Sequence, residues 1–236
     1  MIALIIPTYN ERDSLPRLVQ AVLNLSLPLQ IIIVDDNSPD GTGKWADNLA
    51  AKNSAVRVIH RPRKLGLGTA YKEGFRVALE SKADYIMGMD ADYSHDPQYL
   101  PLLWEKAQQT QADIVIGSRY TKDGRMDSPW HRRVLSAIAN SLVHRLLSLK
   151  ARDATSGFRC YKATTLAQLP LERVTASGYS FLFEMSNLIE RSGGVVAEVP
   201  IVFHDRSEGQ SKISWREVWQ SWRTIWRLRR DNRASQ

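Results

Sequence analysis

The sequence has one cysteine, Cys160, and five histidines. A single thiol excludes internal disulfides and cysteine-rich zinc sites, and it fits a reducing compartment such as the cytosol. No apolar run approaches the roughly 20 residues that a membrane-spanning helix needs. The N-terminal MIALIIPTYNERD lacks a basic n-region and a small-residue cleavage site, so we do not expect a signal peptide.

Basic residues exceed acidic ones, and the formal net charge is +7. This excess indicates an anionic partner, such as nucleic acid, phospholipid or a phosphorylated substrate, unless it is only a basic surface. A nucleic-acid-binding module would interleave basic and exposed aromatic residues along a groove. Here these residues gather in one C-terminal segment, and the ends of the predicted strands are acidic, so we expect no nucleic-acid partner.

Short Ile- and Val-rich runs alternate with longer helical patterns in the first half of the chain. Strands without polar alternation, separated by helices, predict a mainly parallel sheet flanked by helices, a Rossmann-like α/β fold. No linker or internal repeat interrupts it. The expected strands are 3–7, 30–36, 56–60, 84–90 and 113–118, with helices near 13–25, 42–53, 69–82 and 97–110.

The second half of the chain has a less regular pattern. We expect a long amphipathic helix at 131–149 and a loop that leads into a strand within 153–162. A helix follows near 180–192, then a strand or hairpin within 194–206, and a final helix at about 214–230.

Polar side chains follow the predicted strands where each strand ends. The segments PTYNE, DDNSPDGT, DADYSHD and GSRY come directly after four of them. Ligands of open α/β sheets bind beyond the carboxyl ends of the strands. We therefore expect one edge of the sheet to carry Tyr9, Glu11, Asp35, Asp36, Asp90, Asp92 and Arg119.

Asp90 and Asp92 lie two residues apart at the end of the fourth strand. Two nearby carboxylates need a countercharge, and hard oxygen ligands favour Mg²⁺ or Mn²⁺. Such ions take their remaining ligands from phosphates and water, so the pair predicts a metal–diphosphate site. The alternative is a pair of loop-capping aspartates, which the nearby acids of the second strand make less attractive.

The glycine-rich KLGLGTAYKEG suggests a dinucleotide fingerprint, with Gly66 and Gly68 as its first two glycines. However, Tyr71 stands at the third glycine position, and the loop follows the third strand instead of the first. We therefore interpret it as a loop and a helix start, and we reject a dehydrogenase.

Together these segments resemble the dolichol-phosphate (polyprenyl-phosphate) mannosyltransferases, a branch of the family-2 glycosyltransferases with the GT-A fold. The shared motifs are IIPTYNE, VDDNSPDGT, KLGLGTAY, MDADYSHDP, IGSRY, RRVLSAIAN, DATSGFRCY and DRSEGQSKIS, between residues 2 and about 213. The resemblance implies metal-dependent, inverting transfer of mannose from GDP-mannose to a polyprenyl phosphate, by a peripheral protein on the cytoplasmic face of a membrane. UDP-glucose or another nucleotide sugar remains the alternative donor.

The resemblance also implies roles for individual residues, with Asp92, Arg119 and Arg132 as the catalytic ones. Two positions depart from the family: Ser94 and Leu182 stand where glutamine is common. The implied contacts are Pro7, Tyr9, Glu11 and Asp36 to the nucleoside; Asp90 and Asp92 to the metal; Arg119, Arg132 and Ser136 to the acceptor phosphate; and Arg206 and Lys212 to the donor diphosphate.

The chemistry of such a transfer fits these residue types. Positive charge develops at the anomeric carbon, and a metal with basic side chains stabilises the leaving diphosphate. The acceptor phosphate is already ionised, so it needs orientation by Arg119 and Arg132 instead of a strong base. The alternative for each arginine is a surface ion pair. We expect His95, the histidine nearest the acidic pair, to be solvated or satisfied in the core.

The C-terminal SWREVWQSWRTIWRLRR has tryptophans spaced by 4, 3 and 4 residues. At about 100° per residue they share one helical face, which suits the headgroup layer of an anionic membrane. The alternative is that they pack on the catalytic domain. The tryptophans are Trp215, Trp219, Trp222 and Trp226, and the arginines beside them are Arg216, Arg223, Arg227 and Arg230.

The helix expected at 131–149 also has an apolar side, which either lines the path of the lipid or packs in the core. We divide the chain into a catalytic domain, 1–213, and an amphipathic helix, 214–236. Family members without a membrane span can rely on a membrane-embedded partner, so such a partner stays open. The apolar side comprises Val134, Leu135, Ile138, Leu142, Val143 and Leu146.

Overall fold

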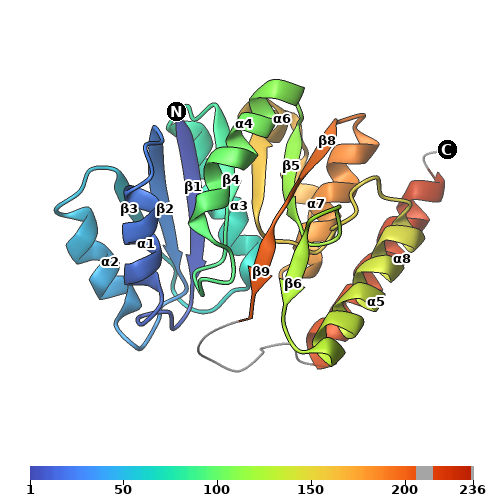
Figure 1. Cartoon of the computed structure of the whole chain (residues 1–236), viewed down its shortest axis with the longest axis horizontal. Coiled ribbons are helices and arrows are strands. Elements are labelled where there is room, and N and C mark those ends of the chain that lie inside the picture. The colour runs from blue at the N-terminus through green and yellow to red at the C-terminus, as the bar shows by residue number, and fades with distance from the viewer. Residues whose placement is uncertain (206–214, 235–236) are drawn as a thin grey trace.

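A computed structural model describes residues 1–205 and 215–234. Figure 1 shows a central sheet with helices on both faces and two long helices together at one end. The first half contains β1 (Ile2–Thr8), α1 (Leu15–Leu23), β2 (Leu29–Asp35), α2 (Thr42–Ala50), β3 (Val56–His60), α3 (Leu67–Glu80), β4 (Tyr85–Gly88), the short 3₁₀ helix η1 (Pro97–Tyr99), α4 (Leu100–Thr110) and β5 (Ile114–Ser118).

The second half contains β6 (Arg125–Asp127), α5 (Trp130–Leu147), β7 (Arg159–Lys162), α6 (Ala163–Gln168), η2 (Leu171–Arg173), α7 (Ser180–Arg191), β8 (Val196–Pro200), β9 (Val202–His204) and α8 (Trp215–Ala234). Within the part of the chain that the structure describes, no helix has the length and hydropathy of a membrane span.

The main sheet has the strand order β3-β2-β1-β4-β7-β5-β8, and every pairing except those of β7 is parallel. Alternate residues of β1 pack on opposite faces: Ile5 joins a core with α3 and α7, whereas Leu4 joins a core with α1 and α4. Both faces of the sheet are therefore buried under helices, which explains why these strands are apolar throughout. The predicted α/β class and mainly parallel sheet are confirmed.

β7 runs antiparallel between β4 and β5, with Arg159 opposite both Gly88 and Ile116. Because of this direction, residues 153–158 precede β7 at the edge where the parallel strands end. The sequence predicted a loop and a strand here, but it did not predict the direction of the strand.

The segment expected to be a strand or hairpin forms two strands in different sheets. β8 extends the main sheet beside β5, whereas β9 pairs in parallel with β6 as a separate two-stranded sheet. A hairpin is therefore wrong. β6 was not predicted because its RMD sequence has only three residues and two of them are exposed.

α5 and α8 lie side by side at one end of the molecule (Figure 1). Val143 and Leu147 of α5, Ile225 and Leu228 of α8 and Phe183 of α7 form one buried cluster. The apolar side predicted for α5 therefore has two environments, and its C-terminal part packs in this cluster. Its earlier residues are exposed: Val134 49%, Leu135 67%, Ile138 60% and Leu142 36%.

Candidate active site

The carboxyl ends of β2, β1 and β4 lie next to one another, as predicted from the strand-end motifs. Asp35 closes the turn after β2: its carboxylate accepts hydrogen bonds from Thr8 Oγ1 at 2.9 Å and from the Ser38 amide at 3.0 Å. Asp35 therefore holds two neighbouring strand ends together.

Asp36 forms a buried ion pair with Arg61, at 2.8 Å from Oδ1 to Nη1. The Leu65 amide donates to its other oxygen at 3.3 Å. Burial raises the pKa of Asp36 more than Arg61 and this amide lower it. The same loop places Lys64 Nζ 4.3 Å from the ring centre of Tyr9. Arg61 and Lys64 were missed from the sequence, although the basic RPRK follows the third strand directly.

Pro7 and Glu11 lie on either side of Tyr9. Pro7 is the half-buried member of β1, paired with Val34 of β2. The Glu11 amide donates to Thr42 Oγ1 at 3.0 Å, and its carboxylate accepts from Ser14 Oγ at 3.0 Å. Glu11 is thus fixed between the starts of α1 and α2.

The glycine-rich segment is a loop and a helix start, as predicted. The Gly68 amide donates to the Ser177 carbonyl at 2.8 Å, and a Cβ on Gly68 would collide with the Ala176 carbonyl oxygen. Gly66 has φ +99°, which favours glycine. These glycines therefore permit close backbone contact with residues 176–177.

Asp90 and Asp92 follow β4 into a tight loop. Asp92 is 6% exposed, and its Oδ1 accepts from the Ser94 amide at 3.0 Å. Gly157 leaves space beside the other carboxylate, since a Cβ there would lie 3.3 Å from Asp90 Oδ1. Burial, and to a smaller extent the charge of Asp90, raises the pKa of Tyr71 well above its ordinary value, so the Tyr71 ring lies close to Asp90.

The donor set of this loop fits a hard divalent cation. Among the described residues no group of three or more acidic, histidine or cysteine side chains could hold a metal. Asp90, which lies against the backbone of Gly157, and Asp92 nevertheless match the way Mg²⁺ is usually bound, with one or two carboxylates and with phosphates and water as further ligands. Ser94, where the family often has glutamine, has a buried hydroxyl that no described residue hydrogen-bonds.

His95 supports this loop from within the core. It is 1% exposed, and its ring stacks on Phe158 at 5.0 Å and meets the edge of Phe203 at 5.4 Å. The Asp90 amide donates to its Nδ1 at 3.4 Å. The core role considered for His95 is therefore confirmed.

Arg119, just after β5, forms a two-pronged ion pair with Asp153. Its Nε and Nη2 donate to the carboxylate at 2.8 and 2.7 Å, and its amide also donates to Oδ2 at 3.0 Å. Burial opposes both charges, but their attraction and hydrogen bonds outweigh it, so the pKa of Arg119 is raised and that of Asp153 lowered. The charge of Asp90 adds to the raised pKa of Arg119, which indicates that these groups are near each other.

Asp153 was missed from the sequence, although it opens the DATSGFRCY motif. Its side chain is fully buried, and its own amide donates to Glu198 Oε1 at 2.9 Å. A carboxylate with this burial was not foreseeable without knowledge of its partner, Arg119.

Arg132 and Ser136 lie in the first turns of α5. Arg132 Nη1 donates to both carboxylate oxygens of Asp205, at 2.9 and 2.8 Å, and its side chain is 49% exposed. Ser136 Oγ hydrogen-bonds the Tyr120 hydroxyl at 2.8 Å. Tyr120 follows Arg119 in the chain, so α5 and the end of β5 meet here. The predicted Arg206 and Lys212 lie outside the described residues.

The tryptophans of α8 whose side chains are described point away from the core. Trp219, Trp222 and Trp226 are 67%, 37% and 64% exposed, whereas Ile225 and Leu228 of the same helix are buried. Trp219 and Trp226 therefore do not pack on the catalytic domain, whereas Trp222 is mostly covered.

Comparisons with known proteins identify a family and relatives of this chain. A family described as "Glycosyl transferase family 2" matches residues 3–169. An undecaprenyl-phosphate mannosyltransferase of Micrococcus luteus is 43% identical over 211 residues, which cover 89% of this chain and 86% of that protein. A polyprenol monophosphomannose synthase of Mycolicibacterium smegmatis is 43% identical over 212 residues, covering 89% and 80%.

Solved structures share the fold at low sequence identity. A mannosyl-3-phosphoglycerate synthase from Rubrobacter xylanophilus aligns with a TM-score of 0.71 and 18% identity, covering all of this chain and 76% of that one. A glucosyl-3-phosphoglycerate synthase from Mycobacterium tuberculosis, in complex with Mn²⁺, UDP and glucosyl-3-phosphoglycerate, aligns with a TM-score of 0.63 and 19% identity, covering 95% of this chain and 77% of that one. At such identities the likeness concerns the fold.

Proposed function

This chain belongs to glycosyl transferase family 2, and on that premise we propose that it transfers mannose from GDP-mannose to a polyprenyl phosphate, with inversion at the anomeric carbon. The main support is the identity with two bacterial enzymes named for mannose transfer to polyprenyl carriers. Polyprenyl phosphate is thus the acceptor, and the carboxyl edge of the sheet is the site.

The nucleoside occupies the end of this edge formed by β2 and β1. Pro7, Tyr9, Glu11 and Asp36 contact it. Lys64, which lies beside Tyr9, gives this end a basic side chain for the donor phosphates, and the buried ion pair with Arg61 holds Asp36 in place. Arg206 and Lys212 complete the diphosphate contacts from the segment outside the described residues.

Asp90 and Asp92 would hold a divalent cation, Mg²⁺ or Mn²⁺. When bound, the cation would neutralise negative charge on the departing diphosphate. Asp92 is held by the Ser94 amide, so its carboxylate is oriented before any ligand arrives. That orientation is the contribution of the protein, because a preorganised charge needs no rearrangement as the reaction proceeds.

Arg119, Arg132 and Ser136 bind the acceptor phosphate. Asp153 accepts hydrogen bonds from Nε and Nη2 of Arg119, and no described residue accepts one from Nη1, so this nitrogen can bind a ligand. An oxygen of the ionised acceptor phosphate attacks the anomeric carbon as the bond to the diphosphate breaks. No proton has to be removed from the nucleophile, so arginines that orient it are sufficient.

The protein acts as a peripheral protein at the cytoplasmic face of the membrane. α5 carries the acceptor residues Arg132 and Ser136 as well as the exposed Leu135 and Ile138. The exposed tryptophans of α8 lie on the neighbouring helix. Apolar and aromatic side chains in this setting suit the headgroup layer. The division into a catalytic domain, 1–213, and an interfacial helix, 214–236, stays a prediction, as does a membrane-embedded partner.

A donor assay tests the proposal. The full chain is incubated with a short polyprenyl phosphate, Mn²⁺ or Mg²⁺, and labelled GDP-mannose or UDP-glucose. We expect labelled lipid when the donor is GDP-mannose and none when the donor is UDP-glucose. Labelling with UDP-glucose alone would replace the donor, and labelling with neither would refute sugar transfer to this lipid.

A further inference from the structure

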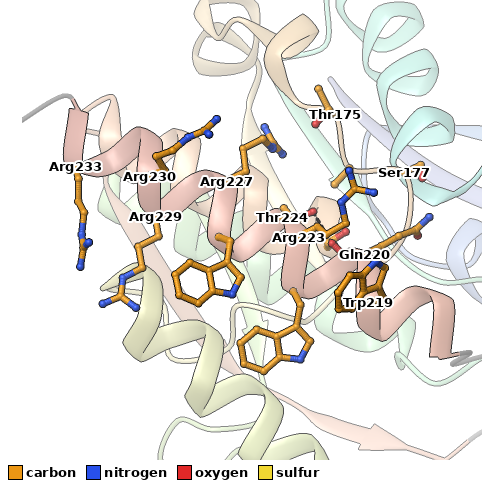
Figure 2. A pocket seen from close by; sticks show the side chains of 14 residues that line it. Thr175, Ser177, Trp219, Gln220, Arg223, Thr224, Arg227, Arg229, Arg230 and Arg233 are labelled. Carbon is orange, nitrogen blue, oxygen red and sulfur yellow. Dashed lines mark hydrogen bonds between the residues drawn. The ribbon is translucent and has the colours of Figure 1, made fainter.

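A groove of about 1050 Å³ lies between α8 and the segment that precedes α7. One wall includes Thr175, Ser177 and Ser180, and the other is formed by α8 (Figure 2). None of the described donor, metal or acceptor residues proposed above lines it. We call it the arginine groove, because Arg223, Arg227, Arg229, Arg230 and Arg233 line it.

The arginines at 223, 227 and 230 recur at helical spacing. In Figure 2 they project from α8 toward the side of Thr175 and Ser177. Two acidic groups lie close to them: Glu184 Oε1 is 2.6 Å from Arg227 Nη2, and Asp231 Oδ1 is 4.0 Å from Arg230 Nε. With five arginines and these two carboxylates, the groove keeps a positive charge that attracts anions.

Glu184 organises both walls of the groove. It is 2% exposed, and besides Arg227 it accepts from the amides of Ala176 at 2.9 Å and Thr175 at 3.3 Å. The Arg227 side chain is still 30% exposed. A guanidinium that is already held by a buried carboxylate loses little further freedom when its outer N–H groups bind a phosphate.

Tryptophans form the rim of the same groove. Trp219 and Trp226 line it and are 67% and 64% exposed, and the Arg229 guanidinium lies 6.0 Å from the ring centre of Trp226. Amphipathic rings beside arginines are typical of the depth at which lipid headgroups lie. A soluble anion would need the arginines but would gain nothing from these rings.

We propose that the arginine groove binds the phosphate headgroup of an anionic phospholipid, at a site separate from the one for the polyprenyl acceptor. This inference rests on the membrane placement in the proposed function, but not on the sugar transfer. The bound lipid would fix the orientation of α8 on the bilayer, beyond the general attraction of a basic surface.

A charge-conserving variant tests the site. Arg223→Lys with Arg230→Lys keeps the net charge but removes the planar fork that binds phosphate. We expect the affinity of the full chain for phosphatidylcholine vesicles containing phosphatidylglycerol to fall about tenfold, since charge-assisted forked bonds are lost. The matched control is Lys52→Arg with Lys82→Arg, two exposed positions outside the groove, which should bind these vesicles like wild type.

The remaining outcomes separate the alternatives. Wild-type vesicle binding by the groove variant would overturn the site and leave only diffuse attraction. Wild-type vesicle binding by the groove variant, together with its loss of the inorganic-phosphate binding that the wild type shows, would assign the groove to a soluble anion instead. Transfer to a short polyprenyl phosphate in detergent is measured in parallel, and the groove variant should retain it. If the wild type itself showed no sugar transfer in this assay, the proposed function would be refuted, but the vesicle result would still stand.

Discussion

Replacement of Asp153 by asparagine should destabilise the protein strongly. The substitution keeps the size of the side chain but leaves the guanidinium of Arg119 buried without its countercharge, at 8% side-chain exposure. Removal of one partner from a buried ion pair typically costs about 3–5 kcal/mol. Domains are stable by roughly 5–15 kcal/mol, so the variant should still fold.

A matched control separates burial from charge. Asp205→Asn also breaks an arginine–carboxylate pair, but Arg132 and Asp205 are 49% and 33% exposed. An exposed pair contributes about 0–1 kcal/mol, so this variant should unfold almost like wild type. The double variant Arg119→Met with Asp153→Asn should be more stable than Asp153→Asn alone, because no unpaired buried charge remains.

Urea unfolding followed by far-UV circular dichroism measures these differences. With a denaturant slope of about 2–3 kcal/mol per molar, a loss of about 3–5 kcal/mol lowers the midpoint by roughly 1–2.5 M. A shift of the Asp153→Asn midpoint no larger than that of Asp205→Asn would refute the reasoning.

The pH dependence gives a second test of the same pair. The pKa of Asp153 is lowered in the folded protein from its ordinary 3.8. The ion pair therefore contributes fully above about pH 3.8, and this contribution is lost as the pH falls through the lowered folded pKa. The stability difference between wild type and Asp153→Asn should be constant near neutrality and should shrink below about pH 3.8. A difference that grows on acidification would contradict the assigned direction.

Three further predictions concern the proposed active site and membrane face. Asp92→Asn should lower sugar transfer by at least about 100-fold and weaken Mn²⁺ binding in the presence of GDP, seen by electron paramagnetic resonance; unchanged Mn²⁺ binding would exclude its metal role. Arg132→Ala should raise the KM for polyprenyl phosphate by about tenfold or more and leave the KM for the donor unchanged. The same substitution at its exposed neighbour, Arg133→Ala, should change neither KM. Equal effects of the two substitutions would show that the acceptor does not use Arg132. The double variant Trp219→Ser with Trp226→Ser should bind neutral vesicles more than tenfold more weakly, because each tryptophan is over 60% exposed. An unchanged affinity for these vesicles, with wild-type thermal stability, would argue against a membrane role for this face.

Deletion of α8 would be a poorer test than these substitutions. Ile225 and Leu228 are 4% and 7% exposed and pack with Val143, Leu147 and Phe183. Their removal would expose a buried cluster, so lost vesicle binding would be confounded with lost stability.

The alternation of apolar strands with helices was sufficient to predict the first five strands of the sheet and the helices between them. Those elements depend on local periodicity, and on the need to bury both faces of a parallel sheet, which a single sequence contains. The edge with Asp36, Asp90 and Asp92 followed from the same pattern, because parallel strands must end together. The spacing of the tryptophans likewise placed them on one helical face.

Only the tertiary structure decided which charges meet. Arg119 and Asp153 are 34 residues apart, and they pair because β7 runs antiparallel and brings its preceding loop to the active edge. Arg61 reaches Asp36 from the end of β3, which lies parallel beside β2. The exposure of Leu135 and Ile138, and the groove beside α8, depend on which side of each helix its neighbours cover. Local patterns determine the elements, whereas contacts between distant segments determine direction, partners and exposure, and these carry the chemistry of the site.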